Sequence, residues 1–242
     1  MSAPAQSQRV AIEIQDVTVA DLDDISQGNI DLLAPFHDEM EFQPFLPDRI
    51  ARQSSRLALL LSNPLVQFRK AVLKEDPTKL AGIALWMWTP AGQKPQNLKR
   101  RFLETLPRTE DDDEDLWKGL DWEKWNKCWD EWDAVRDRFM NRREHWYLVP
   151  LWVKNEYQGQ GIGRQLLIEK INECEQASAT VPIYLEASKD GKPLYEKLGF
   201  EQFGESYYKE MIRWGTRGNE DDLARTRKMT TDYLAETGRT RF

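Results

Sequence analysis

The most informative part of this sequence is the stretch Tyr157-Gln158-Gly159-Gln160-Gly161-Ile162-Gly163-Arg164. It follows an apolar run, residues 148–153, and it precedes a segment whose apolar residues have helical spacing. A glycine-rich turn between a strand and a helix presents main-chain N–H groups at the positive end of the helix dipole. This pattern is typical of a phosphate-binding loop built from the main chain, with a plain tight turn as the alternative interpretation.

The spacing of the glycines narrows the choice of phosphate-binding loop. Gly159, Gly161 and Gly163 occupy alternate positions, whereas the dinucleotide fingerprint requires its third glycine one residue later, where Arg164 stands. The Walker pattern also fails, because no Gly-Lys-Ser/Thr follows. What remains is Gln-x-x-Gly-x-Gly, with Gln158 as its first residue.

The segments around this turn predict alternating strands and helices. Period-two and helical patterns indicate a strand at 10–14, a capped helix start at Thr18, a helix over 47–61, a hairpin of 68–74 with 80–88, a strand at 147–153, a helix over 163–177, a strand at 182–187, a short helix over 192–198 and two strands within 200–212. Pro150 places the strand at 147–153 at a sheet edge or at a bulge. We expect an α+β fold, α/β/α-like, with a mixed central sheet flanked by helices.

The domain organisation follows from shifts in composition. We expect residues 1–8 to be disordered and residues 9–216 to form one domain with a helical insertion at about 91–143. Residues 217–242 form a polar tail, in which residues 221–234 have a pattern compatible with a helix. Tryptophans at positions 122, 125, 129 and 132 share one helical face of the insertion. This pattern favours core packing, and an aromatic wall for a cationic substrate is the alternative. The acidic run 110–115 indicates a solvated loop, or one that attracts cations.

A second motif lies downstream, Leu194-Tyr195-Glu196-Lys197-Leu198-Gly199-Phe200. Together with the Gln-x-x-Gly-x-Gly turn, it resembles the GNAT acetyltransferase superfamily over residues 144–214, and more weakly over 9–90. The resemblance implies the GNAT acyl-CoA N-acyltransferase fold and acetyl-CoA as co-substrate, with no metal. It also implies that Tyr195 acts as general acid toward the departing thiolate, with structural packing of its ring as the alternative.

The resemblance further implies a set of residues that bind acetyl-CoA. The pyrophosphate would lie on the main chain of Gln158, Gly159, Gln160, Gly161, Ile162, Gly163 and Arg164, and the pantetheine arm along Leu151, Trp152 and Val153. Many members carry an asparagine seven residues before the tyrosine, where this chain has Ser188. We therefore expect Ser188 to donate one hydrogen bond to the pantetheine arm.

The general base is the least determined part of the site. Some family members use a glutamate eleven residues before the loop glutamine, where this chain has Tyr147. The remaining candidates are Glu186, His145 and its neighbour Glu144. Strand alternation places Glu186 on the same face as Ser188. A chain of water molecules to the surface is the alternative to all three.

Composition limits the classes of partner and location. The chain has 242 residues and a net charge of −7, which argues against nucleic acid as a partner. The two cysteines, Cys128 and Cys174, form no metal-binding pattern, and no segment resembles a signal peptide or a membrane span. We expect a cytoplasmic protein, with a nuclear location and a homodimer left open.

The sequence therefore predicts an N-acetyltransferase that moves an acetyl group from acetyl-CoA to a primary amine by direct attack of the amine on the thioester. The acceptor is an amine-bearing small molecule or peptide. The alternative is a GNAT-like acyl-CoA-binding or regulatory protein without turnover, because the family's glutamate and asparagine are replaced here.

Overall fold

The computed structural model describes residues 9–33, 48–96, 116–117, 119–177, 181–203 and 209–215, and the single helical positions 224, 228 and 232. The predicted disorder of residues 1–8 and the acidic run 110–115 lie outside the described residues. So does the tail 217–242, apart from the three helical positions.

The described elements agree in type and order with the sequence patterns. They are β1 (Ile12–Asp16), η1 (Val19–Asp21), α1 (Leu22–Leu32), α3 (Arg49–Leu61), β2 (Val66–Leu73), β3 (Leu80–Thr89), α6 (Trp122–Met140), β4 (His145–Val153), η3 (Asn155–Tyr157), α7 (Ile162–Ala177), β5 (Ile183–Ala187), α8 (Lys192–Lys197), β6 (Glu201–Gln202) and β7 (Lys209–Arg213). Within the predicted insertion, α6 begins after Asp121, whose side chain accepts a hydrogen bond from the Lys124 N–H at 2.9 Å.

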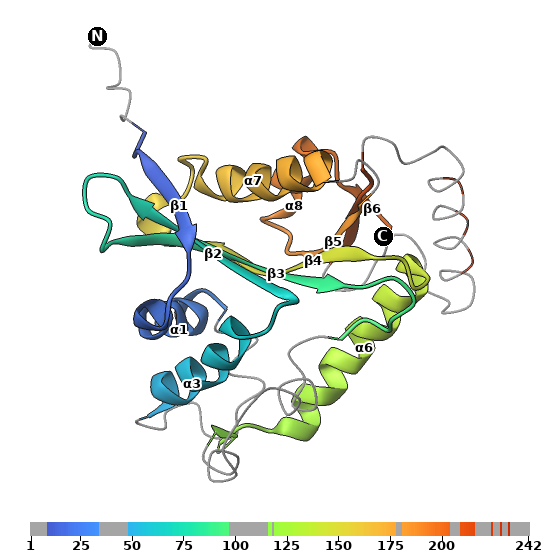
Figure 1. The fold of residues 1–242 in the computed structure, drawn as a ribbon, viewed down its shortest axis with the longest axis horizontal. Coiled ribbons are helices and arrows are strands. Elements are labelled where there is room, and N and C mark those ends of the chain that lie inside the picture. The colour runs from blue at the N-terminus through green and yellow to red at the C-terminus, as the bar shows by residue number, and fades with distance from the viewer. Residues whose placement is uncertain are drawn as a thin grey trace.

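The strands form one seven-stranded sheet in the order β1-β2-β3-β4-β5-β7-β6. The β4–β5 pair is parallel and the other neighbours are antiparallel, so the predicted mixed sheet is confirmed. Helices α7 and α8 cover one face of the sheet, whereas α1, α3 and α6 lie on the other (Figure 1). The sheet therefore separates two apolar cores, each between one sheet face and its helices.

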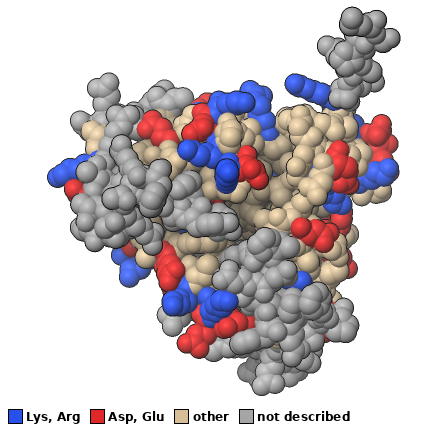
Figure 2. Space-filling model, turned by 180° about the vertical axis from the view of Figure 1, so that it is seen from behind, with Lys and Arg blue, Asp and Glu red and all other residues tan. Residues whose placement is uncertain are grey.

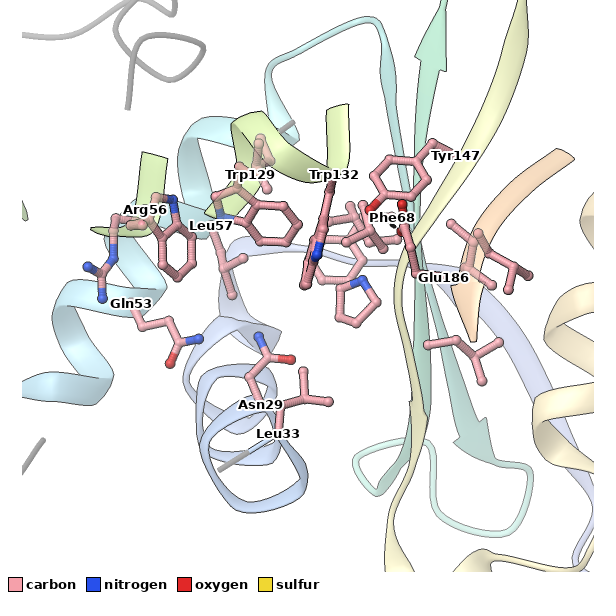
Figure 3. A pocket seen from close by; sticks show the side chains of 18 of the residues that line it. Asn29, Leu33, Gln53, Arg56, Leu57, Phe68, Trp129, Trp132, Tyr147 and Glu186 are labelled. Carbon is pink, nitrogen blue, oxygen red and sulfur yellow. Dashed lines mark hydrogen bonds between the residues drawn. The ribbon is translucent and has the colours of Figure 1, made fainter. Parts of the chain in front are cut away.

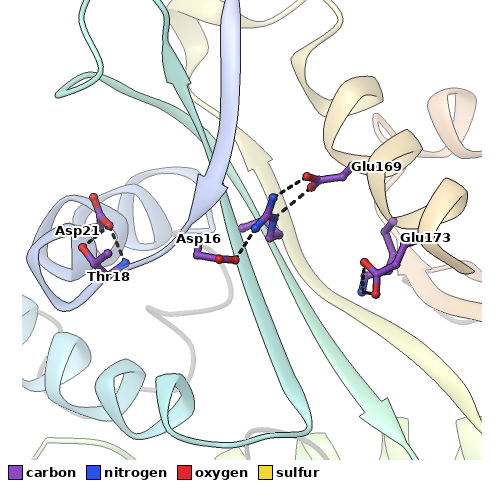
Figure 4. Close-up of polar contacts among 7 residues, drawn as sticks. Asp16, Thr18, Asp21, Glu169 and Glu173 are labelled. Atoms are coloured by element: carbon purple, nitrogen blue, oxygen red, sulfur yellow. Dashed lines mark hydrogen bonds and ion pairs between the residues drawn. The ribbon is translucent and has the colours of Figure 1, made fainter. Parts of the chain in front are cut away.

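Strand β2 ties both layers to the sheet through two adjacent cations. Successive side chains of a strand point to opposite faces. Accordingly, Arg69 reaches Glu169 of α7 at 2.6 Å, whereas Lys70 reaches Asp21 at 2.6 Å on the α1 side. Figure 4 shows the ion pair that Glu169 forms with a cation of β2, and the hydrogen bonds that join Thr18 to Asp21. The Asp21 carboxylate thus accepts hydrogen bonds from Thr18, the residue that caps η1, as expected for a capped helix start.

Strand β4 is interrupted where Pro150 stands. The strand lies inside the sheet, so the edge position was wrong for this proline. The bulge alternative is confirmed, because the register with β3 shifts between Ala84 and Trp86, opposite Leu148–Leu151. On its other side β4 forms only two pairs with β5 in the described chain, Trp146 with Ile183 and Tyr147 with Tyr184. Beyond Tyr147 the two parallel strands diverge.

The surface of the described residues mixes both signs of charge. Lys and Arg lie among Asp and Glu on the face seen in Figure 2. None of the helices in the described part of the chain combines the length and the apolar character that a membrane span requires.

Candidate active site

The glycine turn leads directly into α7. Gly159 and Gly161 have φ values of +74° and +84°, a region that side chains with a Cβ rarely adopt, and the space beside each is open. The Gln165 N–H bonds to the Gly161 carbonyl at 3.0 Å and begins the helical ladder. The first N–H groups of a helix have no partner within it, so this turn offers main-chain donors to an anion.

Two glutamine side chains brace the turn. Gln158 donates from Nε2 to the Val153 carbonyl and to Asn155 Oδ1, both at 3.0 Å, and its own N–H bonds to the Asn155 carbonyl. Gln160 accepts from the Val10 N–H at 2.9 Å. The structure therefore assigns the Gln158 side chain to holding the turn, because both of its amide N–H groups are used internally.

Gly163 differs from the other two glycines. It has no positive φ, and a Cβ there would meet Leu151, Leu194 and Val153 at ordinary contact distances of 3.5–3.6 Å. Gly163 consequently sets how closely α7 lies on β4 and α8. Arg164 is exposed, and Ile162 is buried beneath the helix start.

A cavity of about 220 Å³ lies where β4 and β5 diverge. Its lining includes Leu148, Leu185 and Tyr195 from the α7 side of the sheet, and Phe68 and Trp129 from the α6 side. Because both apolar cores contribute to one lining, the cavity passes through the sheet at the gap. Pro150, at the bulge of β4, lines this opening.

The β4 main chain beyond Tyr147 borders this gap, but only some of its side chains line the cavity. Leu151 lines the cavity. Trp152 instead donates from Nε1 to Asn29 Oδ1 of α1 at 2.7 Å, and its ring fills the space beside Gly28. The side chains of Trp152 and Val153 are outside the lining. Their predicted role in binding pantetheine involves the main chain alone.

Glu186 is the carboxylate that points into the cavity. Its Oε2 accepts a 2.6 Å hydrogen bond from the Tyr147 hydroxyl, whereas Oε1 is buried and has no hydrogen-bond partner in the described residues. Burial raises the pKa of Glu186 to about 7, opposed by the charge of Arg136 and by the Tyr147 hydrogen bond. A carboxyl with this pKa and one unoccupied oxygen is suited to accept a proton near neutral pH.

Arg136 of α6 packs against Tyr147, the hydrogen-bond partner of Glu186. Its guanidinium lies 3.7 Å from the centre of the Tyr147 ring and donates to Asp133 Oδ1 at 2.8 Å. The side chain is 1% exposed. Sequence reasoning missed Arg136, although it continues the spacing of Trp125, Trp129 and Trp132 and therefore shares their buried face.

Tyr195 lies at the α8 side of the cavity. Its ring packs against Phe200, with centroids 5.6 Å apart, and burial raises the pKa of its hydroxyl. The hydroxyl has no hydrogen-bond partner within the described chain, so it keeps its proton available for a ligand. Ser188 also lines the cavity, and its Oγ accepts from the Gly191 N–H at 3.1 Å, which leaves the hydroxyl proton free to donate.

His145 does not belong to this cavity, which corrects its place among the candidate bases. Its ring is fully buried at the start of β4, and Nδ1 donates to the Arg143 carbonyl at 2.7 Å. Burial and the charge of Arg136 lower the pKa of His145 to about 3 despite that hydrogen bond. Neighbouring Glu144 is exposed and outside the lining as well.

The tryptophans of the insertion contribute to the core, as the sequence pattern favours, and several of them also line the cavity. Trp125 and Trp129 are buried in the core, and together with Trp117 and Trp132 they line the cavity. Figure 3 shows Trp129 and Trp132 side by side in this lining. The side chain of Trp122 lies outside the described residues. In the described ranges, no group of His, Cys, Asp and Glu side chains is arranged to hold a metal ion.

Comparisons with known proteins agree with this geometry. Residues 138–216 match the acetyltransferase (GNAT) domain model, a range that holds the glycine turn, Glu186 and Tyr195. Over this range the chain is therefore similar to GNAT acetyltransferase domains. An uncharacterized N-acetyltransferase of Schizosaccharomyces pombe is 40% identical over 70 residues, and the match spans 28% of this chain and 28% of that relative's length.

Two solved structures share the fold of this chain. A protein of Corynebacterium glutamicum, described as a histone acetyltransferase and related acetyltransferase, has a TM-score of 0.53 at 20% identity, over 86% of this chain and 99% of that chain. An N-acetyltransferase of Staphylococcus aureus has a TM-score of 0.54 at 16% identity, over 83% and 99%. The predicted GNAT acyl-CoA N-acyltransferase fold is confirmed.

Proposed function

We propose that this protein transfers an acetyl group from acetyl-CoA to a primary amine, with Glu186 as general base and Tyr195 as general acid. The observation that supports this most is the buried, unpartnered Oε1 of Glu186, a residue that lines the cavity between β4 and β5. A buried carboxylate oxygen without a partner is costly in a purely structural role. A substrate amine would satisfy it.

The residues around the cavity fit acetyl-CoA. Gly159 and Gly161 have open space beside them and stand at the start of α7, where main-chain N–H groups would hold a pyrophosphate. The gap beyond Tyr147 leaves the β4 main chain available to a pantetheine arm. When bound, acetyl-CoA supplies an acetyl thioester and, as its leaving group, a thiolate.

The protein's own groups would then manage two protons. As the neutral amine forms its bond to the carbonyl carbon and the C–S bond breaks, Glu186 accepts one proton from the amine nitrogen. Tyr195 donates its hydroxyl proton to the thiolate and regains one from solvent, while Glu186 releases its own. The products are the N-acetylated amine and CoA with a free thiol, so atoms and charge balance.

Glu186 also compensates for the departure from the family pattern at position 147. Some members carry their catalytic glutamate there, whereas this chain has Tyr147. The carboxylate of Glu186 approaches that position from the neighbouring strand, because its Oε2 bonds to the Tyr147 hydroxyl. This contact argues against the alternative of an acyl-CoA-binding module without turnover.

Transfer of label from acetyl-CoA to a panel of amines, together with calorimetry of CoA binding, tests the proposal. Gly161→Trp should remove CoA binding, because the new side chain strains a backbone at φ +84° and covers the turn. Gly92→Trp is the matched control, with φ +80° and equally open space but outside the site. Loss of CoA binding in Gly161→Trp alone supports the proposal. A wild-type protein that does not bind CoA would refute it.

A further inference from the structure

The α6 side of the cavity is a continuous apolar wall. Trp129 packs edge-on against Trp132 with centroids 4.6 Å apart, and against Trp125 at 5.5 Å. Interlocked rings of this kind form a stiff surface that keeps its shape without a ligand. Aliphatic and aromatic side chains from α1, α3 and β2 complete the wall: Leu33, Leu57, Leu60 and Phe68.

Charge along the cavity is sparse. Among the described lining residues, Glu186 and Arg56 are the charged side chains. Figure 3 shows them at opposite ends, with Trp129, Trp132 and Leu57 between them. Within this set Glu186 offers the one carboxylate, so a ligand with several ammonium groups finds a described counter-charge for one of them. The distribution therefore favours a ligand with a single amino group.

Near Arg56 the cavity is lined by Gln53 and Trp117, and each has a buried polar atom without a partner in the described chain, Gln53 Oε1 and Trp117 Nε1. Gln53 is 6% exposed and Trp117 5%. Gln53 stands one turn from Arg56 on α3, and Arg56 lies 5.9 Å from the Trp117 ring centre. A buried acceptor and a buried donor at one end of a cavity are satisfied together by a hydroxyl group.

The wall is better suited to the amine than to a long acyl chain. An acyl chain that extended from the β4–β5 gap toward α6 would pass the Glu186 carboxylate and surround it with methylene groups. Burial of a charged carboxylate against hydrocarbon is unfavourable. An amine at the same place gains a hydrogen bond to the unpartnered Oε1.

We infer that the acceptor is a primary monoamine with a bulky apolar body, which lies against the tryptophans with its amino group at Glu186 and a hydroxyl at the end near Gln53 and Trp117. This inference rests on the proposed acetyl transfer and narrows its substrate class. It excludes polyamines and the lysine side chains of basic peptides as preferred acceptors.

Four amines test the inference through kcat/KM for acetyl transfer. Tyramine carries all three features, phenethylamine lacks the hydroxyl, spermidine is a polycation, and a capped lysine peptide offers a flexible aliphatic amine. We expect tyramine to exceed phenethylamine by about tenfold, the discrimination of one satisfied hydrogen-bond pair, and the other two by more. A preference for spermidine or the peptide, or equal use of phenethylamine, would overturn the inference.

A pair of tryptophan variants connects the preference to the wall. Trp132→Ala removes part of the wall, whereas Trp146→Ala removes a comparably half-buried tryptophan that packs on Trp88 and Lys170 outside the cavity. Trp132→Ala should raise KM for tyramine about tenfold or more, and Trp146→Ala should change it less than twofold. Equal effects of the two variants would contradict the assignment.

The same experiments separate this inference from the proposed function. If CoA does not bind, the acetyltransferase proposal fails. If CoA binds and spermidine is the best acceptor, acetyl transfer stands and the inference fails. If hexanoyl-CoA reacts about tenfold faster than acetyl-CoA and Trp132→Ala removes that preference, the wall holds an acyl chain and the inference is again overturned.

Discussion

Replacement of Glu186 by glutamine tests the physical basis of the site most directly. Glutamine keeps the size of the side chain and can still accept the Tyr147 hydrogen bond, but it cannot take a proton from the amine. The carboxyl faces Tyr147 on β4, Arg136 and Asp133 on α6, and Glu210 on β7. Burial dominates over these neighbours and raises its pKa from 4.5 to about 7.

The raised pKa has a consequence for stability that can be calculated. A group whose folded pKa lies above its unfolded value stabilises the protein fully below the unfolded pKa, and this contribution is lost as pH rises through the folded pKa. Between pH 4.5 and 7 the wild-type protein should therefore lose about 3 kcal/mol relative to Glu186→Gln, at about 1.4 kcal/mol per pH unit. The variant becomes relatively more stable as pH rises.

Urea unfolding of both proteins from pH 4.5 to 8 measures this difference. In parallel, kcat/KM of the wild type should rise with pH, and the rise should become shallower above about pH 7, because the base must be ionised. Glu186→Gln should lose about 10²- to 10⁴-fold in kcat/KM, together with that inflection. A constant difference in unfolding free energy would refute the raised pKa. An inflection that persists in the variant would identify another group as the base.

Three further predictions concern neighbouring parts of the site. Gly163→Ala should retain CoA binding, because its Cβ meets neighbours at ordinary distances. Gly161→Ala should lose about 1–2 kcal/mol of stability through its positive φ, and it should bind CoA more weakly. Equal calorimetric affinities of the two variants for CoA would contradict this. Tyr195→Phe should keep the affinity for CoA and lower kcat about 10²-fold or more, and an unchanged kcat would restrict Tyr195 to packing. Arg136→Met should lower the free energy of unfolding by about 3–5 kcal/mol, because it breaks a buried ion pair. It should also move the kcat/KM inflection to a higher pH than in the wild type, because it removes a charge that lowers the pKa of Glu186. An unmoved inflection would show that Arg136 acts through packing alone.

Local patterns were sufficient for most of the fold. The β-rich run of residues 80–88 corresponds to β3, and helical spacing over 163–177 corresponds to α7, because apolar periodicity reports which face a helix buries. The boundaries moved by one or two residues, as in β1, which begins at Ile12 rather than at residue 10. Element ends depend on hydrogen bonds to distant strands, and no local pattern contains them.

The sequence identified some residues of the candidate site and missed others. The glycine turn and Tyr195 were identified from motifs, since their roles depend on main-chain geometry and on a short helix that follows it. Arg136 was missed because a buried arginine has no distinct local pattern, and its partner Tyr147 is close only in the folded chain. His145 was selected for its ordinary pKa, and burial in the core removed both its access to the cavity and that pKa.

The sequence by itself therefore determined the glycine turn before α7, the mixed sheet and the presence of a tryptophan face, because each follows from residue types at fixed local spacing. Only the tertiary structure decided what lies between β4 and β5. Divergence of the two strands beyond Tyr147 opens the sheet, brings Glu186 and Tyr195 to one cavity and sets the insertion helix α6 as its far wall. The physical reason is that burial and proximity, which set the pKa of Glu186 and the shape of the cavity, arise from segments that are distant along the chain.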